Sequence, residues 1–228
     1  MISVVIPSMN RPERLLAVVP SVLCTTTPPH DVEVIVVIDC DTKSRDWMLH
    51  LNDNRIRVLF NEQRRGAIAC WNQGLAAARG DVLVFFNDDC DPQDRWLDAA
   101  IKAHREQLGG YGLVGFNDGY QDGTRLSVHY LFDRQFCIDH LGGVMAYPVY
   151  EFYANDSEAN ARAKRAGRFF WCKDAVVQHR HWTRPGEAHK DALDMENEPK
   201  AQRDMALYAQ REAYGFPNNF EPVLKGNA

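Results

Sequence analysis

Carboxylates and amides gather directly after an apolar stretch near the middle of the chain. Residues 82–86 are apolar without a break, and four of the five positions in 87–91 are Asn or Asp. An unbroken run of this kind predicts a central strand that is buried on both faces. The polar residues therefore lie at its carboxyl end, which is where ligands bind in open α/β sheets.

The acids in this stretch predict a cation site. Asp88, Asp89 and Asp91 crowd negative charge into a short turn, which costs energy unless a positive charge is bound. Oxygen ligands suit a hard cation such as Mg²⁺ or Mn²⁺. The alternative is a solvated turn that ends in Asp-Pro, which is common in loops. The buried strand in front of the acids favours the ligand site.

A second predicted strand, residues 33–38, is apolar from Val34 onward and also ends in acids, Asp39 and Asp41. The carboxyl ends of parallel strands meet at one edge of a sheet. If the two runs are neighbouring parallel strands, Asp39 and Asp89 lie near each other, and a ligand bound at that edge could contact both.

The elements that must position these acids alternate between strands and helices. We expect strands at 2–7, 33–38, 56–60 and 82–86, and helices from Pro12, at 66–78 and at 94–107. This rhythm with short connections predicts a doubly wound α/β fold with a mostly parallel sheet. The second half is less regular, with strands predicted at 111–116, 126–132 and 175–178 and helices at 155–165 and 201–214. The polar segment 183–200 holds two prolines and a glycine and is predicted to be a mobile loop.

Composition narrows the class of protein. The chain has 228 residues, of which 45% are hydrophobic and 25% charged, as in an ordinary globular domain. Its net charge of −5 argues against general nucleic-acid binding. The six cysteines are scattered without a C-x-x-C pair, which is typical of reduced cytoplasmic proteins. No apolar run approaches the roughly 20 residues that span a bilayer, and Met1 leads straight into a predicted strand, so we expect neither a membrane span nor a signal peptide.

These pieces, taken in order, resemble the family 2 glycosyltransferases, which have the nucleotide-diphospho-sugar transferase (GT-A) fold. The resemblance covers roughly residues 2–181. Its motifs are residues 3–8 with Asn10 and Arg11, 34–39, 61–72, 78–82, 87–91, Gly142 with Gly143, Asn155 with Asp156, and 175–179. It implies one domain over 1–228, with a nucleotide-binding half (1–92), an irregular acceptor and catalytic half (93–182), and a flexible loop with a C-terminal helix (183–228).

The resemblance also implies where a nucleotide-sugar donor binds. Asp39 matches the acid that accepts the N3–H of the base, which suits UDP or dTDP. Further donor-binding residues are implied at Pro7, Ser8, Asn10, Arg11, Arg65, Asn72, Asn87 and Asp88. Asp89 matches the acid that binds Mn²⁺ or Mg²⁺, and His179 matches a histidine near the metal, with Asp91 as a further candidate.

Asp156 matches the general base of the family, which takes the proton of the acceptor hydroxyl. The implied reaction is an inverting, metal-assisted single displacement onto a glycan or other hydroxyl acceptor. A cytoplasmic location, peripheral to a membrane in some settings, fits this reading.

Two departures from the family pattern bear on the nucleotide. Trp71 stands where an arginine is common, and Asn87 replaces the first acid of the D-x-D motif. They leave open a degenerate protein that binds a nucleotide or glycan without turnover. A sugar-nucleotide pyrophosphorylase is a further alternative, although residues 8–12 lack the glycine-rich loop that it requires. The sequence leaves the donor sugar, the acceptor and the oligomeric state open.

Overall fold

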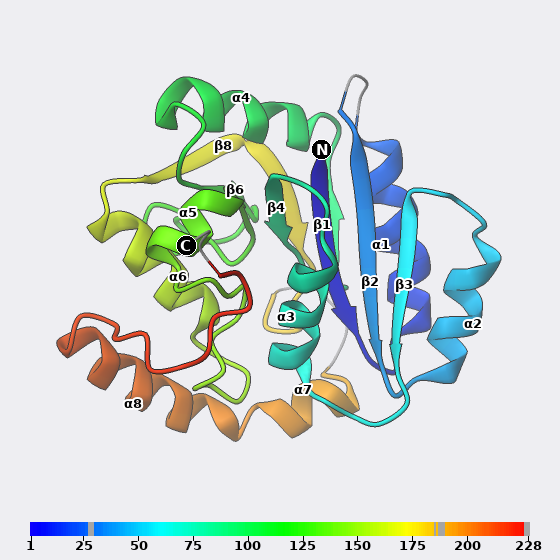
Figure 1. The fold of residues 1–228 in the computed structure, drawn as a ribbon. Coiled ribbons are helices and arrows are strands. Elements are labelled where there is room, and N and C mark those ends of the chain that lie inside the picture. The colour runs from blue at the N-terminus through cyan, green and yellow to red at the C-terminus, as the bar shows by residue number, and fades with distance from the viewer. Residues whose placement is uncertain (27–29, 185, 187–189, 226–228) are drawn as a thin grey trace.

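The structure is a computed structural model that describes residues 1–26, 30–184, 186 and 190–225. Its strands follow the order β3-β2-β1-β4-β7-β6-β8-β5 (Figure 1). The parallel part consists of β1 (Ile2–Ser8), β2 (Val32–Asp39), β3 (Ile56–Asn61) and β4 (Val82–Phe85). The predicted α/β arrangement is therefore confirmed. β1 pairs with both β2 and β4 and separates them, so the two acid-ending strands are not the direct neighbours considered above, although their carboxyl ends lie at the same edge of the sheet.

The sheet changes direction beyond β4. β7 (Tyr130–Asp133) is antiparallel to β4 and to β6 (Leu113–Asn117), while β8 (Phe169–His179) is parallel to β6. The short β5 (Cys90–Pro92) pairs antiparallel with the end of β8, and Cys90 lies opposite His179. This pairing brings the turn after β4 against the carboxyl end of β8.

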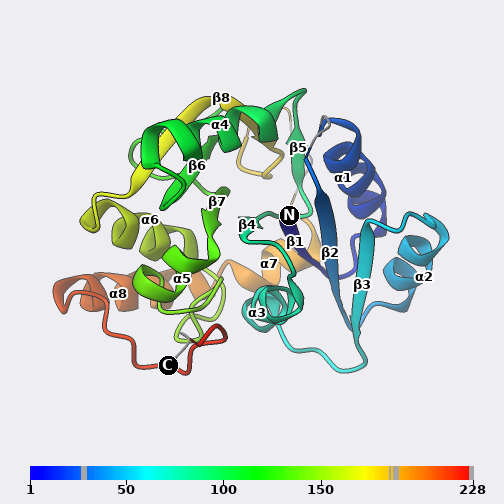
Figure 2. The same ribbon diagram turned by 45° about the horizontal axis from the view of Figure 1, so that its top comes forward.

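Helices cover both faces of the sheet because side chains alternate along each buried strand. Val4 and Ile6 of β1 pack with α1 (Pro12–Cys24), α2 (Thr42–His50) and α4 (Trp96–Leu108). Val5 packs on the other face with α3 (Ala67–Ala77), α5 (Arg134–His140) and α6 (Asn155–Arg165). Figure 2 shows α1 and α3 on opposite sides of β1 and β2.

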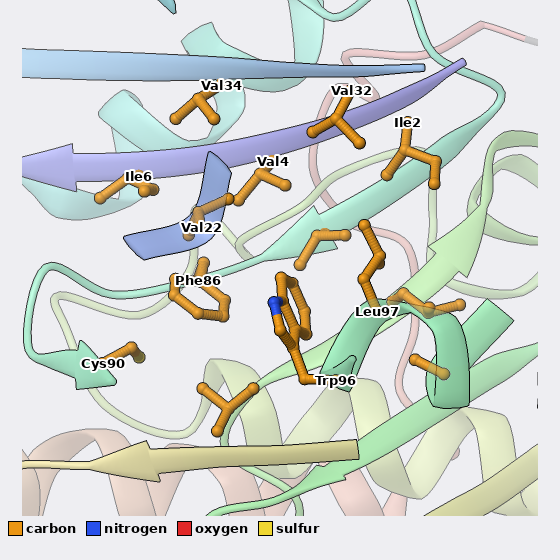
Figure 3. Packing of buried hydrophobic residues seen from close by; sticks show 14 of the residues in the cluster. Ile2, Val4, Ile6, Val22, Val32, Val34, Phe86, Cys90, Trp96 and Leu97 are labelled. Carbon is orange, nitrogen blue, oxygen red and sulfur yellow. The ribbon is translucent and has the colours of Figure 1, made fainter. Parts of the chain in front are cut away.

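The indole of Trp96 fills the centre of the first core. Trp96 is fully buried, and its ring centroid lies 5.4 Å from that of Phe86. Figure 3 shows both side chains in the same layer as Ile2 and Val4 of β1. Phe86, which directly precedes the acidic turn 87–91, is therefore held in place by the core.

Two expectations need correction. The predicted strand 126–132 begins only at Tyr130, because the Ser127 backbone pairs with the Asn160 side-chain amide instead of a neighbouring strand. Within 183–200, which we predicted to be a loop, residues 192–197 form helix α7 (Ala192–Asn197). Its Asp191 and Asp194 form a reciprocal capping box that the loop prediction overlooked. Residues 185 and 187–189 lie outside the described part.

The C-terminal residues pack back onto the domain. α8 (Lys200–Ala213) is followed by a tail whose Leu224 N–H donates to the Gly143 carbonyl at 2.8 Å. A Cβ atom on Gly143 would lie 2.3 Å from the Leu224 carbonyl oxygen, and Gly143 has φ +71°. Glycine is therefore required at this point. In the described part of the chain, the helices lack the length and apolar character needed to cross a membrane.

Candidate active site

A cleft of about 500 Å³ opens at the carboxyl ends of β1, β2 and β4. It collects most of the residues that the sequence singled out. Those that line it are Pro7, Ser8, Arg11, Asp39, Asn87, Asp88, Asp89, Asp156 and His179. They come from segments up to 172 positions apart in the sequence, counting from Pro7 to His179. The fold therefore places both predicted acid clusters in one cavity.

Asp39 lies at the end of β2 and is 3% exposed. Its two carboxylate oxygens accept the backbone N–H groups of Arg65 and Gly66, each at 2.8 Å at the closest. Asp39 thus fixes the start of α3. An ionised carboxylate offers about four acceptor positions, so it retains capacity for a ligand N–H.

Asp88 is part of a buried polar cluster at the cleft floor. Its carboxylate accepts a hydrogen bond from the Ser8 hydroxyl at 2.7 Å and lies 3.2 Å from Arg11 Nη1. Burial and the neighbouring Asp89 raise the pKa of Asp88 despite the opposing charge of Arg11. Arg11 also pairs with Asp191 and Asp194 next to and on α7. Carboxylates therefore outnumber guanidinium groups here, which favours an added cation.

Asp89 lies beside two histidines. One ligand atom each of Asp89, His129 and His179 lie within 4.8 Å of one another. Asp89 Oδ1 and His179 Nε2 are 3.2 Å apart, yet neither atom has a partner with hydrogen-bond alignment in the described part of the chain. Burial opposes ionisation of Asp89, but the charge of His179 outweighs it and lowers its pKa. The residues present fit a divalent cation.

Asp156 stands in the first turn of α6 and lines the cleft. Its Oδ1 accepts the Ser157 N–H at 2.8 Å. Burial raises the pKa of Asp156, with this hydrogen bond as the main opposing effect. A carboxylate with a raised pKa is better matched to proton transfer near neutral pH. Asn155, in contrast, is a structural residue, because its side chain bonds to the Tyr147 N–H and the Phe152 carbonyl.

Four residues predicted from the sequence are outside the described lining of the cleft. The Asn72 side chain is buried and bonds to the backbone of Met145 and Ala146. Asn10 and Arg65 are exposed, and each uses its backbone N–H to hold an acid, Asp41 and Asp39 respectively. The Asp91 carboxylate lies 2.6 Å from Arg180 Nη2. Because both ends of the buried Asn72 side chain are already bonded to the backbone, a direct contact of Asn72 with the donor is the prediction that the geometry disfavours most.

The structure gives Trp71 a place in the site and adds contacts that the sequence did not reveal. Trp71, which departs from the family pattern, lines the cleft and stacks on Phe85, with ring centroids 4.4 Å apart. Asp204 of α8 is fully buried and accepts the N–H groups of residues 151–153, which lead into α6. Neither role has a local signal, since each depends on contacts between distant segments. His129 was missed for the same reason.

Comparisons with known proteins agree with this geometry. The model of the family "Glycosyl transferase family 2" matches residues 3–179. Glycosyltransferase AglE of Haloferax volcanii is 30% identical over 125 residues, which cover 51% of this chain and 38% of AglE. The chain spans 38–50% of the length of three curated relatives that it matches.

Solved structures share the fold. The mannosyltransferase PcManGT of Pyrobaculum calidifontis, solved with GDP-Man and Mn²⁺, superimposes with a TM-score of 0.68 at 16% identity, over 93% of this chain and 64% of that one. TarS 1–349 of S. aureus, solved with UDP-GlcNAc, gives 0.64 at 17% identity, over 77% and 57%. The predicted GT-A fold is therefore confirmed.

Proposed function

Because the chain belongs to glycosyl transferase family 2, we propose that it transfers a sugar from a nucleoside-diphosphate donor to a hydroxyl group of an acceptor such as a glycan. The observation that carries this proposal is the meeting of Asp39, Asp89 and Asp156 in one cleft. Each acid stands on a different element and suits a different part of the reaction. The proposed outcome is a single displacement with inversion at the anomeric carbon.

The donor is held at the carboxyl edge of β1, β2 and β4. Asp39 accepts the imide N–H of uracil or thymine, which makes UDP- and dTDP-sugars the favoured donors. Arg11 and Arg64 line the same cavity, but both are already paired with carboxylates, so the charge of the diphosphate is left to the bound cation. The two solved structures hold GDP-Man and UDP-GlcNAc respectively. The test of donor binding therefore includes guanine as well as uracil and thymine nucleotides.

Asp89 and His179 hold a divalent cation, Mn²⁺ or Mg²⁺, beside the diphosphate. When bound, such a cation supplies Lewis-acid stabilisation of the leaving nucleoside diphosphate. The protein contributes the buried site and the position of the donor. Binding the acceptor hydroxyl in line with the anomeric carbon further lowers the entropic barrier.

Asp156 accepts the proton of the acceptor hydroxyl. Its position in the first turn of α6 is fixed from two sides, by the Asn155 side chain and by the contacts of Asp204 with residues 151–153. Glu158, two residues on, is fully occupied by Arg162, Arg211 and Tyr150, and it is not among the described residues that line the cleft. Glu151 also lines the cleft, but it pairs with Arg203 at 3.2 Å, so Asp156 is the carboxylate that we assign to this role.

The test is a thermal-shift screen of UDP-, dTDP- and GDP-sugars with and without Mn²⁺, followed by an assay of nucleotide release. A ligand that binds only the native state raises the melting temperature. We expect metal-dependent stabilisation by one donor class and turnover of that donor. Stabilisation without release or transfer, across a panel of glycan acceptors, would support the degenerate binding protein instead. Absence of any stabilisation would contradict the proposal.

A further inference from the structure

Three side chains from separate elements converge beneath the cleft. Asp89 lies in the turn between β4 and β5, His129 directly precedes β7, and His179 ends β8. One ligand atom of each lies within 4.8 Å of the other two. The side chains of Asp89 and His179 are 8% and 10% exposed, and His129 is 1% exposed. The group is therefore nearly closed to bulk water.

Each of the three residues has a buried polar atom that lacks a hydrogen-bond partner in the described part of the chain. The atoms are Asp89 Oδ1, His129 Nδ1 and His179 Nε2. A buried polar atom without a partner costs about 1–3 kcal/mol. An unpartnered atom on each of three residues whose ligand atoms meet, one of them on a carboxylate, is the arrangement expected of ligands for a cation.

The surroundings of His129 orient it for this role. Its other ring nitrogen, Nε2, lies 3.2 Å from Cys90 Sγ. When Nδ1 binds a cation, Nε2–H donates toward that sulfur, and ligating histidines are normally held by such an outer contact. Cys90 in turn lies opposite His179 in the β5–β8 pair. The same short strand therefore supports both imidazoles.

We propose that His129 is a ligand of the same metal centre as Asp89 and His179; a preference of this centre for a first-row transition-metal ion such as Mn²⁺ over Mg²⁺ then follows from the donor set. Two imidazole nitrogens and one carboxylate form the donor set. Imidazole suits transition metals, whereas Mg²⁺ prefers an octahedron of oxygens. Three protein ligands leave coordination positions open for diphosphate oxygens. The inference rests on the proposed function only for the role of the ion, since metal binding is measurable without a donor.

A packing role for His129 makes a different prediction. Its ring lies edge-to-face on His179, with centroids 4.7 Å apart, and 5.7 Å from the ring of Phe86. If packing were its whole contribution, His129→Phe would preserve the shape of the site and bind metal normally. If His129 is a ligand, the same substitution removes one nitrogen from the metal.

The experiment uses the full chain without nucleotide. Free Mn²⁺ is followed by electron paramagnetic resonance during titration, and pulsed measurements count the nitrogens coupled to the bound ion. We expect two nitrogens in the unmodified protein, and Mn²⁺ binding at least about tenfold tighter than Mg²⁺ in competition. His129→Phe should leave one nitrogen and weaken Mn²⁺ binding by about 10- to 100-fold, on the scale seen when metal-site contacts are lost. His179→Phe should behave likewise.

His104→Phe is the matched control, since His104 is also buried but bonds to Asp133 outside the centre. The His104→Phe protein should keep two nitrogens coupled to bound Mn²⁺ and bind Mn²⁺ with unchanged affinity. If circular dichroism shows that His129→Phe does not fold, His129→Gln replaces it, and one coupled imidazole nitrogen is again expected. Two nitrogens retained in a folded His129 variant would overturn the ligand assignment, and tighter binding of Mg²⁺ would overturn the metal preference. Mn²⁺ held by both histidines without any sugar transfer would refute the proposed function and leave this inference standing.

Discussion

Replacing Asp156 by Asn separates catalysis from structure in this site. The amide oxygen of Asn can still accept the Ser157 N–H, which Asp156 Oδ1 accepts at 2.8 Å. It cannot take a proton from the acceptor. General-base catalysis typically contributes a factor of about 10²–10⁴, or about 2.7–5.4 kcal/mol of barrier. We expect turnover to fall by this factor, in kcat more than in donor KM, because the proton moves only in the transition state.

The same substitution should raise stability. Burial raises the pKa of Asp156 above its ordinary value of 3.8. The folded state therefore binds more protons than the unfolded state between the two pKa values, so the free energy of unfolding falls as pH rises through that interval. The free energy of unfolding that is lost in this interval is not regained at neutral pH. Asn at position 156 does not ionise, so the variant does not lose it. Asp156→Asn should thus melt at a higher temperature than the unmodified protein at pH 7, and the difference should shrink as pH approaches 3.8.

Nucleotide release with the best donor from the thermal-shift screen measures the first effect, and melting curves across pH measure the second. Asp174→Asn, at an exposed site in the same half, should change neither. A well-folded Asp156→Asn protein that transfers sugar at a near-normal rate would remove Asp156 from the mechanism. A lower melting temperature at pH 7 would show that the carboxylate stabilises the fold, contrary to the burial argument.

Three further predictions address the donor, the cation and the scaffold. Asp39→Ala should weaken UDP binding by about 1–3 kcal/mol in calorimetry, because a buried partner is lost; unchanged affinity would remove Asp39 from base recognition. EDTA should abolish transfer until Mn²⁺ or Mg²⁺ is restored, and Asp89→Asn should lose metal-dependent nucleotide binding, whereas full activity in EDTA would exclude a metal site. Glu158→Gln should cost about 3–5 kcal/mol of unfolding free energy in denaturant titrations, because buried Arg211 loses its ionised partner; the exposed Glu212→Gln is its control, and an equal, small effect of both would contradict this account.

The parts of the fold that the sequence predicted are those with a strong local pattern. The apolar runs 34–38 and 82–86 predicted β2 and β4, and these strands place Asp39 and Asp89 at the same edge. α2 escaped prediction because only Ser44 and Met48 of its nine residues are buried, so it has no apolar stripe. α5 is only seven residues long, too short for a clear period.

The cleft was predictable where family motifs mark it and unpredictable where distant segments meet. Asp89, Asp156 and His179 each follow or begin a recognisable element. His129 has no such mark, because its place in the cluster depends on β7 lying beside β4 and on β5 pairing with β8. Asn72 shows the converse, since a residue within a family motif serves the scaffold by bonding to residues 145–146.

The contacts of α7 and α8 with the rest of the domain also determine where the polypeptide can be truncated without loss of stability. The family match ends at residue 179, which suggests a tempting boundary for a shortened protein. A fragment ending near residue 182 would deprive residues 151–153 of the carboxylate of Asp204, and buried Glu158 of Arg211. It would also release Arg11 from Asp191 and Asp194. We therefore expect a fragment that ends there to be less stable than the full chain, and residues 151–153, which lead into α6 and Asp156, to be among the first residues affected.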